Sequence, residues 1–127
     1  MAFGDDILAD HDLSGEIIGA AIEVQKAIRP ELREKTYENA LCIELAERNI
    51  HFSQQDSFIV YYKGKPVDKF IPDLIVSDSI IIEIKTSEKI TDEHVSQLLN
   101  YLHITKLKLG LILNFKTIPI GIKRLAL

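Results

Sequence analysis

Asp73, Glu83 and Lys85 place two carboxylates and an ammonium group close together in the middle of the sequence. Each of them interrupts a short apolar run, and Ser77-Asp78-Ser79 between the runs has the composition of a turn. We therefore predict two paired strands. Because side chains alternate along a strand, Glu83 and Lys85 share one face, and pairing across the turn brings Asp73 beside them. Such a group at one sheet edge would bind a divalent metal, with a cation positioned next to it.

Two helices are expected before these strands. Asp12 or Ser14 is a candidate N-cap for a first helix that continues to Ala27, with residues 1–12 expected as a loosely ordered N-terminal segment. A second helix is expected over residues 30–48, because its leading proline suits a first helical turn. This second helix contributes the next group of polar residues.

The rest of the chain alternates between strand and helix patterns without a repeat or linker. The predicted order is α-α-β-β-β-α-β-β, a single mixed α/β domain over residues 1–127 with helices packed on a central sheet. After the two helices, strands are predicted near residues 56–62, 70–76 and 80–85, a third helix from Thr91 or Asp92 to about Ile104, and strands at 107–115 and 120–125.

A buried stripe is predicted on the second helix, where Tyr37, Leu41 and Leu45 recur every four residues. Glu34 falls on the same stripe, and Glu38 lies at its edge. A carboxylate that faces a core needs a partner. The alternative, which periodicity alone favours, is that Glu34 stays wet in the first helical turn, where the helix dipole stabilises it.

The third helix carries two stripes. Val95, Leu98, Leu99 and Leu102 form an aliphatic face, while His94, Gln97 and Tyr101 form a separate polar face. A glutamine and a tyrosine one turn apart can hydrogen-bond a phosphate, a base edge or each other. A solvated face that happens to contain a tyrosine is the simpler interpretation of this stripe alone.

Composition and charge restrict the class of protein. The 127 residues are 46% hydrophobic and 27% charged, as in ordinary globular domains. No apolar run approaches the roughly 20 residues that span a bilayer, and the acidic N-terminus lacks the pattern of a signal peptide. With Cys42 as the one cysteine, a reducing compartment fits, so we expect a cytoplasmic protein with no membrane partner.

The net charge of −4 is unevenly distributed. Residues 1–50 contain 5 basic and 11 acidic side chains, a net charge of −6, whereas residues 51–127 contain 10 and 8, a net charge of +2. A basic footprint is typical of nucleic-acid binding, and only the second part of the chain can supply one. The total charge counts mildly against tight non-specific binding to DNA.

Together these segments resemble the GxxExxY family, a branch of the PD-(D/E)XK nuclease superfamily whose signature is matched by Pro72-Asp73 and Glu83-x-Lys85. The resemblance covers nearly the whole chain after Asp12 and implies a restriction-endonuclease-like fold. One departure is that Arg29 and Glu31 stand where the family usually has glycines. The matching segments are Ile17-Ile-Gly-Ala-Ala-Ile-Glu-Val24, Glu34-Lys-Thr-Tyr-Glu-Asn-Ala-Leu41, Glu44-Leu45, Gln55, Tyr62-Lys-Gly-Lys65, Asp73, Ile82-Glu-Ile-Lys85, Gln97-Leu-Leu-Asn-Tyr101, Leu109-Gly-Leu111, Asn114-Phe115 and Ile122-Lys-Arg124.

The resemblance implies a metal site for phosphodiester hydrolysis. Asp73 and Glu83 would bind Mg²⁺ or Mn²⁺, which prefer oxygen ligands. Glu34 would complete the acidic cluster, with Glu38 as the alternative. Lys85 would steady the attacking hydroxide or the developing charge on the phosphate.

Substrate contacts are implied for the polar face of the third helix. Gln97 and Tyr101 match a glutamine–tyrosine motif that positions the strand or the metal ligands in part of the superfamily, and His94 is expected at the rim. The implied activity is a metal-dependent nuclease acting on DNA rather than RNA. The alternative is a non-catalytic module that binds protein or nucleic acid. Because 127 residues leave little room for a target-recognition domain, any specificity would come from a homodimer, another protein partner or substrate structure.

Overall fold

Three helices and seven strands make up the described part of the chain. The computed structural model describes residues 3–127, and from residue 12 onward it also describes their side chains. The elements are α1 (Phe3–Ala27), α2 (Glu34–Glu47), β1 (Phe52–Gln54), β2 (Phe58–Tyr62), β3 (Lys65–Phe70), β4 (Leu74–Val76), β5 (Ile80–Lys85), α3 (Asp92–Thr105), β6 (Leu109–Asn114) and β7 (Gly121–Ala126).

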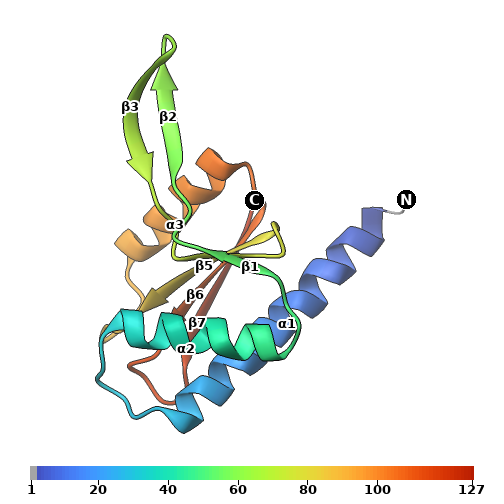
Figure 1. Cartoon of the computed structure of the whole chain (residues 1–127), viewed down its shortest axis with the longest axis vertical. Coiled ribbons are helices and arrows are strands. Elements are labelled where there is room, and N and C mark those ends of the chain that lie inside the picture. Colours follow the sequence, from blue (N-terminus) through green and yellow to red (C-terminus); the bar gives the residue numbers. More distant parts are fainter. Residues whose placement is uncertain (1–2) are drawn as a thin grey trace.

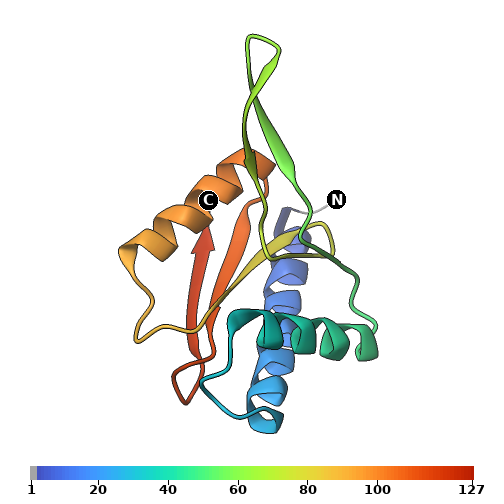
Figure 2. The ribbon, with the colours of Figure 1, turned by 60° about the vertical axis from the view of Figure 1, so that its left-hand side comes forward.

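A five-stranded sheet in the order β1-β4-β5-β6-β7 forms the centre of the molecule. Only β5 and β6 are parallel, and the other neighbours are antiparallel. Helices α1 and α2 cover one face and α3 covers the other (Figure 1, Figure 2). The sheet therefore separates two apolar cores, and the predicted mixed α/β fold is confirmed.

The two predicted strands around residues 77–79 pair as expected. Strand β4 runs antiparallel to β5, and Ser79 N–H donates to the Val76 carbonyl at 3.0 Å across the turn. Ser77 and Asp78 both have positive φ angles, 50° and 52°. Short polar side chains tolerate this left-handed backbone, and so the turn forms where its composition predicts it.

Two strands were missed by the sequence patterns. Strand β1 has only three residues, too few for alternation to show. Strand β3 is exposed along almost its whole length, so no apolar period marks it. The predicted strand at 70–76 is also wrong in extent: β3 ends at Phe70, and β4 begins only at Leu74, after Pro72. Proline lacks the N–H that a ladder needs.

The predicted helix starts need correction as well. Helix α1 already begins at Phe3, so neither Asp12 nor Ser14 caps it. The buried Ser14 hydroxyl instead accepts a hydrogen bond from Arg124 Nη1 at 2.7 Å. Residues 3–12, which were expected in a loosely ordered N-terminal segment, belong to helix α1. Residues 1–2 lie outside the described part of the chain.

Helix α2 begins at Glu34, and Pro30 lies in the loop before it. Glu31 has a left-handed φ of 73°, which breaks the helical path. The Tyr37 hydroxyl donates to the Arg29 carbonyl at 2.7 Å and accepts from Leu32 N–H at 3.2 Å. This buried tyrosine therefore holds the loop that contains Arg29 and Glu31.

Strands β2 and β3 form a separate two-stranded sheet. It projects from the rest of the molecule as a hairpin next to α3 (Figure 1, Figure 2). At its base, Phe58 and Phe70 pack against the core on the α3 side of the central sheet. The chain leaves this base through Pro72 and enters the site that contains Asp73.

Candidate functional site

Strand β5 directs Glu83 and Lys85 toward helix α3. Ile80, Ile82 and Ile84 belong to the core under α1 and α2, whereas Ile81 belongs to the core under α3. Alternation then places Glu83 and Lys85 on the same side as Ile81. The prediction that these two residues share one face is confirmed, and their apolar neighbours anchor the strand on both sides.

The Glu83 carboxylate binds the backbone of Asp73, and the Asp73 carboxylate binds the backbone of Ile84, the residue after Glu83. Asp73 N–H donates to Glu83 Oε2 at 2.8 Å, and Ile84 N–H donates to Asp73 Oδ2 at 2.8 Å. The pairs lie just beyond the last ladder pair of β4 and β5, Leu74 with Ile82. The expected approach of Asp73 to Glu83 is confirmed, and the two carboxylates hold the strand ends in register.

The environment of this pair disfavours negative charge. Burial, followed by repulsion from Asp73, raises the pKa of Glu83 to about 8, although the Asp73 N–H and the charge of Lys85 act in the opposite direction. Burial also raises the pKa of Asp73, with the charge of Glu38 adding to the effect. A cation bound here would stabilise both carboxylates in their charged form.

Glu38 is the carboxylate that helix α2 buries. Its side chain is 3% exposed, and it accepts hydrogen bonds from Gln54 Nε2 at 2.6 Å and from Gln55 Nε2 at 3.0 Å. Lys35 forms an ion pair with it at 3.1 Å. Gln55 Nε2 also lies 3.5 Å from Asp73 Oδ1, so this amide bridges the two carboxylates.

Glu34 lies elsewhere. It is the first residue of α2, is exposed, and accepts a hydrogen bond from Thr86 N–H at 3.3 Å. Its place on the buried stripe is therefore wrong, and the wet first-turn position is confirmed. Tyr37, Leu41 and Leu45 are fully buried as predicted. Thr86 directly follows Lys85 in the chain, so its contact with Glu34 holds Glu34 at the outer edge of the site.

Lys85, Gln97 and Tyr101 form a hydrogen-bonded series across β5 and α3. Lys85 Nζ donates to Gln97 Oε1 at 2.8 Å, and Gln97 Nε2 donates to the Tyr101 hydroxyl at 3.3 Å. Both groups of Gln97 are thus used, and its amide orients the lysine. The polar stripe of the third helix therefore faces the site, and a purely solvated face is excluded.

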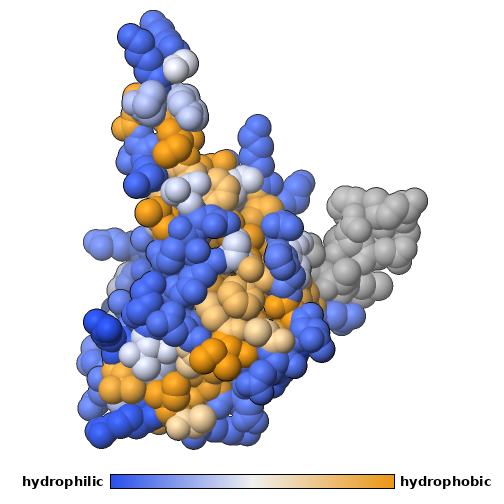
Figure 3. Space-filling view, in the orientation of Figure 1, coloured by the Kyte–Doolittle hydropathy of each residue, from blue (hydrophilic) through white to orange (hydrophobic). Residues whose placement is uncertain are grey.

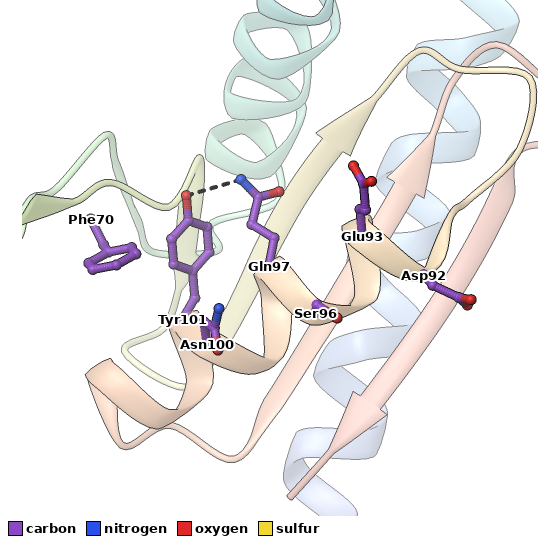
Figure 4. A pocket seen from close by; sticks show the side chains of 7 residues that line it. All are labelled: Phe70, Asp92, Glu93, Ser96, Gln97, Asn100 and Tyr101. Carbon is purple, nitrogen blue, oxygen red and sulfur yellow. Dashed lines mark hydrogen bonds between the residues drawn. The ribbon is translucent and has the colours of Figure 1, made fainter.

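A pocket of about 410 Å³ opens beside this series. Figure 4 shows the Gln97–Tyr101 hydrogen bond and the two acidic side chains from the first turn of α3. A ring from the base of the β2–β3 hairpin forms the opposite wall. The lining residues are Phe70, Asp92, Glu93, Ser96, Gln97, Asn100 and Tyr101.

His94 has a structural contact. Thr91 N–H donates to its Nδ1 at 3.1 Å, while His94 N–H donates to the Thr91 hydroxyl at 3.2 Å. This reciprocal pair caps the start of α3.

Asn114, buried at the end of β6, accepts from Ser87 N–H at 3.1 Å and donates to the Ser87 carbonyl at 2.8 Å. It holds the segment that leads from Lys85 to α3.

Sequence reasoning assigned no role to Gln54 and Gln55. Gln55 was among the residues that carry the family resemblance, but Gln54 carried no signal. Their amides matter only because α2 and β1 meet, which brings residues 15 to 17 positions apart into contact. Gln55 reaches Glu38 from a left-handed backbone position, with φ of 59°.

The donor set fits a hard divalent cation. Among the described residues, no three Asp, Glu, His or Cys side chains come together as a closed metal cage. Asp73 and Glu83 nevertheless offer oxygen donors, and their ionised forms are disfavoured without a counter-charge. Magnesium is usually held by one or two carboxylates, several waters and substrate phosphates, which suits a pair better than a cage.

Comparisons with known proteins identify the superfamily of this chain. The family model described as the PD-(D/E)XK nuclease superfamily matches residues 11–125. The chain therefore belongs to the PD-(D/E)XK nuclease superfamily. The family model does not distinguish the GxxExxY branch.

A solved structure, the crystal structure of SSO0001, superposes with a TM-score of 0.56 and 22% sequence identity. The alignment covers 72% of this chain and 48% of SSO0001, so this chain spans about half of that one. At this identity the likeness concerns the fold. No curated protein matched the sequence. In the described part of the chain, no helix has the length and hydropathy to cross a bilayer.

Proposed function

We propose that this chain is a Mg²⁺- or Mn²⁺-dependent nuclease that hydrolyses phosphodiester bonds in DNA. The observation that carries the proposal is the convergence of Asp73, Glu83 and Lys85 at the end of β5, beside the pocket on α3. Superfamily membership supports phosphodiester hydrolysis as the reaction.

Asp73 and Glu83 would hold the metal, which when bound would acidify a water molecule and neutralise charge on the phosphate. Lys85 would place its ammonium group against the attacking oxygen or the phosphate oxygens. Gln97 holds Lys85 in that orientation through the 2.8 Å contact. The Tyr101 hydroxyl, bonded to the other end of Gln97, would contact the substrate from the pocket side.

For the third acidic position we favour Glu38 over Glu34. The charge of Glu38 acts on both Asp73 and Glu83, and Gln55 links it to Asp73. Glu34 is exposed and makes its contact with Thr86 instead. Glu38 would then add negative charge behind the metal, while Glu34 would lie at the rim.

The test is cleavage of plasmid, linear duplex and single-stranded DNA and of RNA, each with Mg²⁺, Mn²⁺ or EDTA. Lys85→Ala, Asp73→Asn and Glu38→Gln are compared with Lys108→Ala, an exposed lysine outside the site. We expect the wild type and Lys108→Ala to cleave the nucleic acid in Mg²⁺ or Mn²⁺ but not in EDTA. The site variants should lose most of this activity. Equal cutting by all proteins would contradict the proposal.

The alternative is a nucleic-acid-binding module without catalysis. It is favoured by the carboxylates themselves, because one oxygen each of Asp73 and Glu83 already accepts a backbone N–H. Wild-type protein that binds DNA but leaves every substrate intact in both metals would select this alternative. If cleavage required a homodimer or another protein, it would appear at higher protein concentration or on adding that protein.

A further inference from the structure

The β2–β3 hairpin stands apart from both cores and has a surface of its own. Of its strand residues, only Phe58, Val60 and Phe70 are even partly buried. Tyr61 and Tyr62 expose 62% and 64% of their surface. Figure 3 shows hydrophilic residues gathered at the tip and hydrophobic residues along the stem. Large exposed rings on a free ribbon contribute little to folding, which indicates a binding role.

The ribbon is well formed despite its isolation. Tyr62 pairs directly with Lys65, so the loop consists of Lys63 and Gly64 alone. Both loop residues have positive φ angles, 50° and 77°, the geometry of a tight hairpin turn whose twist matches the strands. The turn therefore places both Lys63 and Lys65 at the tip of the hairpin.

The base of the ribbon belongs to the site. Phe70 packs edge-on against Tyr101, with ring centroids 6.0 Å apart and an interplanar angle of 80°. Phe70 also lines the pocket next to Gln97. Strand β3 has six residues, from Lys65 at the tip to Phe70 at the base, which gives a length of about 17 Å at the rise of a β-strand. The hairpin thus extends outward from the wall of the pocket.

Its charge is opposite to that of the chain. The segment from Phe58 to Phe70 contains three lysines, Lys63, Lys65 and Lys69, and one acid, Asp68, whereas the chain carries −4. Lys63 Nζ lies 5.3 Å from the centre of the Tyr62 ring, so cationic and aromatic groups are adjacent at the tip. Phosphates are the natural counter-charge for such a surface.

Taking the proposed nuclease function as its starting point, we propose that this hairpin is an arm that binds duplex DNA. The arm enters the major groove of the DNA and holds the duplex across the site. Two strands about 4.8 Å apart fit a B-form major groove about 12 Å wide, which admits a two-stranded ribbon. Lys63 and Lys65 contact phosphates, and Tyr61 and Tyr62 pack on the groove wall. The deep, narrow major groove of duplex RNA excludes such a ribbon.

The test is binding of a short fluorescent duplex DNA over a series of salt concentrations, with Ca²⁺ or EDTA in place of Mg²⁺. Lys63→Ala/Lys65→Ala is compared with Lys108→Ala/Lys123→Ala, a matched loss of two exposed lysines, and with Lys63→Arg/Lys65→Arg. Thermal melting of each variant verifies that it is folded. Parallel titrations use single-stranded DNA and duplex RNA. Sedimentation of the protein alone measures its oligomeric state.

We expect the alanine tip variant to bind duplex DNA on the order of tenfold more weakly at physiological salt, with a salt slope smaller by about 1.8. The arginine variant and the matched control retain wild-type binding. Unchanged affinity and slope would overturn the inference, as would an equal loss for single strands or duplex RNA. A tip-dependent dimer with no effect on DNA binding would also overturn it.

The outcome for catalysis is separate. Tip-dependent duplex binding without cleavage by wild-type protein supports the arm and contradicts the nuclease. Cleavage that depends on Lys85 but not on the tip supports the nuclease and contradicts the arm. The two proposals therefore fail in different experiments.

Discussion

Two opposing effects act on the carboxylates of Asp73 and Glu83. Each accepts a backbone N–H at 2.8 Å from the segment that carries the other, which aligns the ends of β4 and β5. Glu83 is buried and Asp73 is half-buried, and both lie near negative charge; desolvation and this repulsion raise both pKa values. The hydrogen bonds keep the pair in place, and the repulsion makes it receptive to a cation.

The raised pKa of Glu83 has a consequence for stability. Its pKa rises from 4.5 to about 8 on folding, so the folded protein binds more protons than the unfolded chain between these values. The contribution of Glu83 to stability is therefore complete below about pH 4.5 and is lost as the pH rises through about 8. In EDTA, Glu83→Gln should flatten this decline, measured by urea unfolding at several pH values.

The exposed Glu47→Gln, on α2, is the control for loss of one carboxylate. It should leave the pH dependence as in the wild type. A wild-type protein whose stability rises steadily from pH 5 to pH 8 in EDTA, with no difference for Glu83→Gln, would contradict the assignment.

Cys42 gives a second prediction. Burial, with repulsion from Glu38, raises the pKa of its thiol to about 11, and the side chain is 8% exposed. Because the thiolate is the reactive form, native protein should resist a maleimide at pH 8, whereas protein in urea should be labelled completely. Mass spectrometry measures both states. Rapid labelling of the native protein would show that the thiol is accessible.

Helix α3 depends on a close approach to strand β6. A Cβ built on Gly110 would lie 2.7 Å from Leu98 Cδ1 and 3.0 Å from Leu98 Cγ, so only glycine leaves room for the leucine. This contact and the cap formed by Thr91 and His94 determine where Gln97 and Tyr101 lie above β5. The geometry of Lys85 is thus set partly from the neighbouring strand.

Two glycine substitutions test this packing. Gly110→Ala should lower the free energy of unfolding by about 1–3 kcal/mol, because Leu98 must shift. Gly15→Ala, in helix α1 with nothing within 4 Å of the added carbon, should raise it by about 0.5–1 kcal/mol. Urea denaturation measures both. Equal effects at the two positions would argue against the close approach of α3.

At the scale of the whole molecule, the central sheet separates the larger apolar core from the face that carries the pocket. The larger core lies under α1 and α2, while Lys85, the pocket and the hairpin base lie toward α3. Glu38 approaches Asp73 from α2. The acidic first part of the chain supplies the helices of the larger core, and the basic second part supplies the hairpin. The small net charge therefore conceals a local positive surface.

Metal binding should be visible in the stability of the folded protein. A cation that binds the folded state alone raises the free energy of unfolding, by about 2.7 kcal/mol at one hundred times its dissociation constant. Mn²⁺ should raise the melting temperature of the wild type, and EDTA should reverse the shift. Asp73→Asn should show little shift, while Glu47→Gln should behave as the wild type. Equal shifts in all three proteins would indicate binding elsewhere.

Several features followed from local patterns. The alternation around Glu83 and Lys85 predicted their shared face, the composition of residues 77–79 predicted the turn, and Thr91 predicted the start of α3. In each case neighbouring residues determine the geometry, so a short stretch of sequence contains the necessary information.

Other features depended on contacts between distant segments. Glu34 and Glu38 are one helical turn apart, and the stripe pattern put Glu34 in line with the apolar residues and Glu38 only at their edge. Packing nevertheless buried Glu38, because Gln54 and Gln55 satisfy its carboxylate. The exposed strand β3 had no apolar period to reveal it. The sequence by itself thus determined the fold class and the Asp73–Glu83–Lys85 group, through local periodicity. The burial of Glu38 near Asp73 and the projecting hairpin were determined by packing, because burial and exposure are properties of the assembled chain.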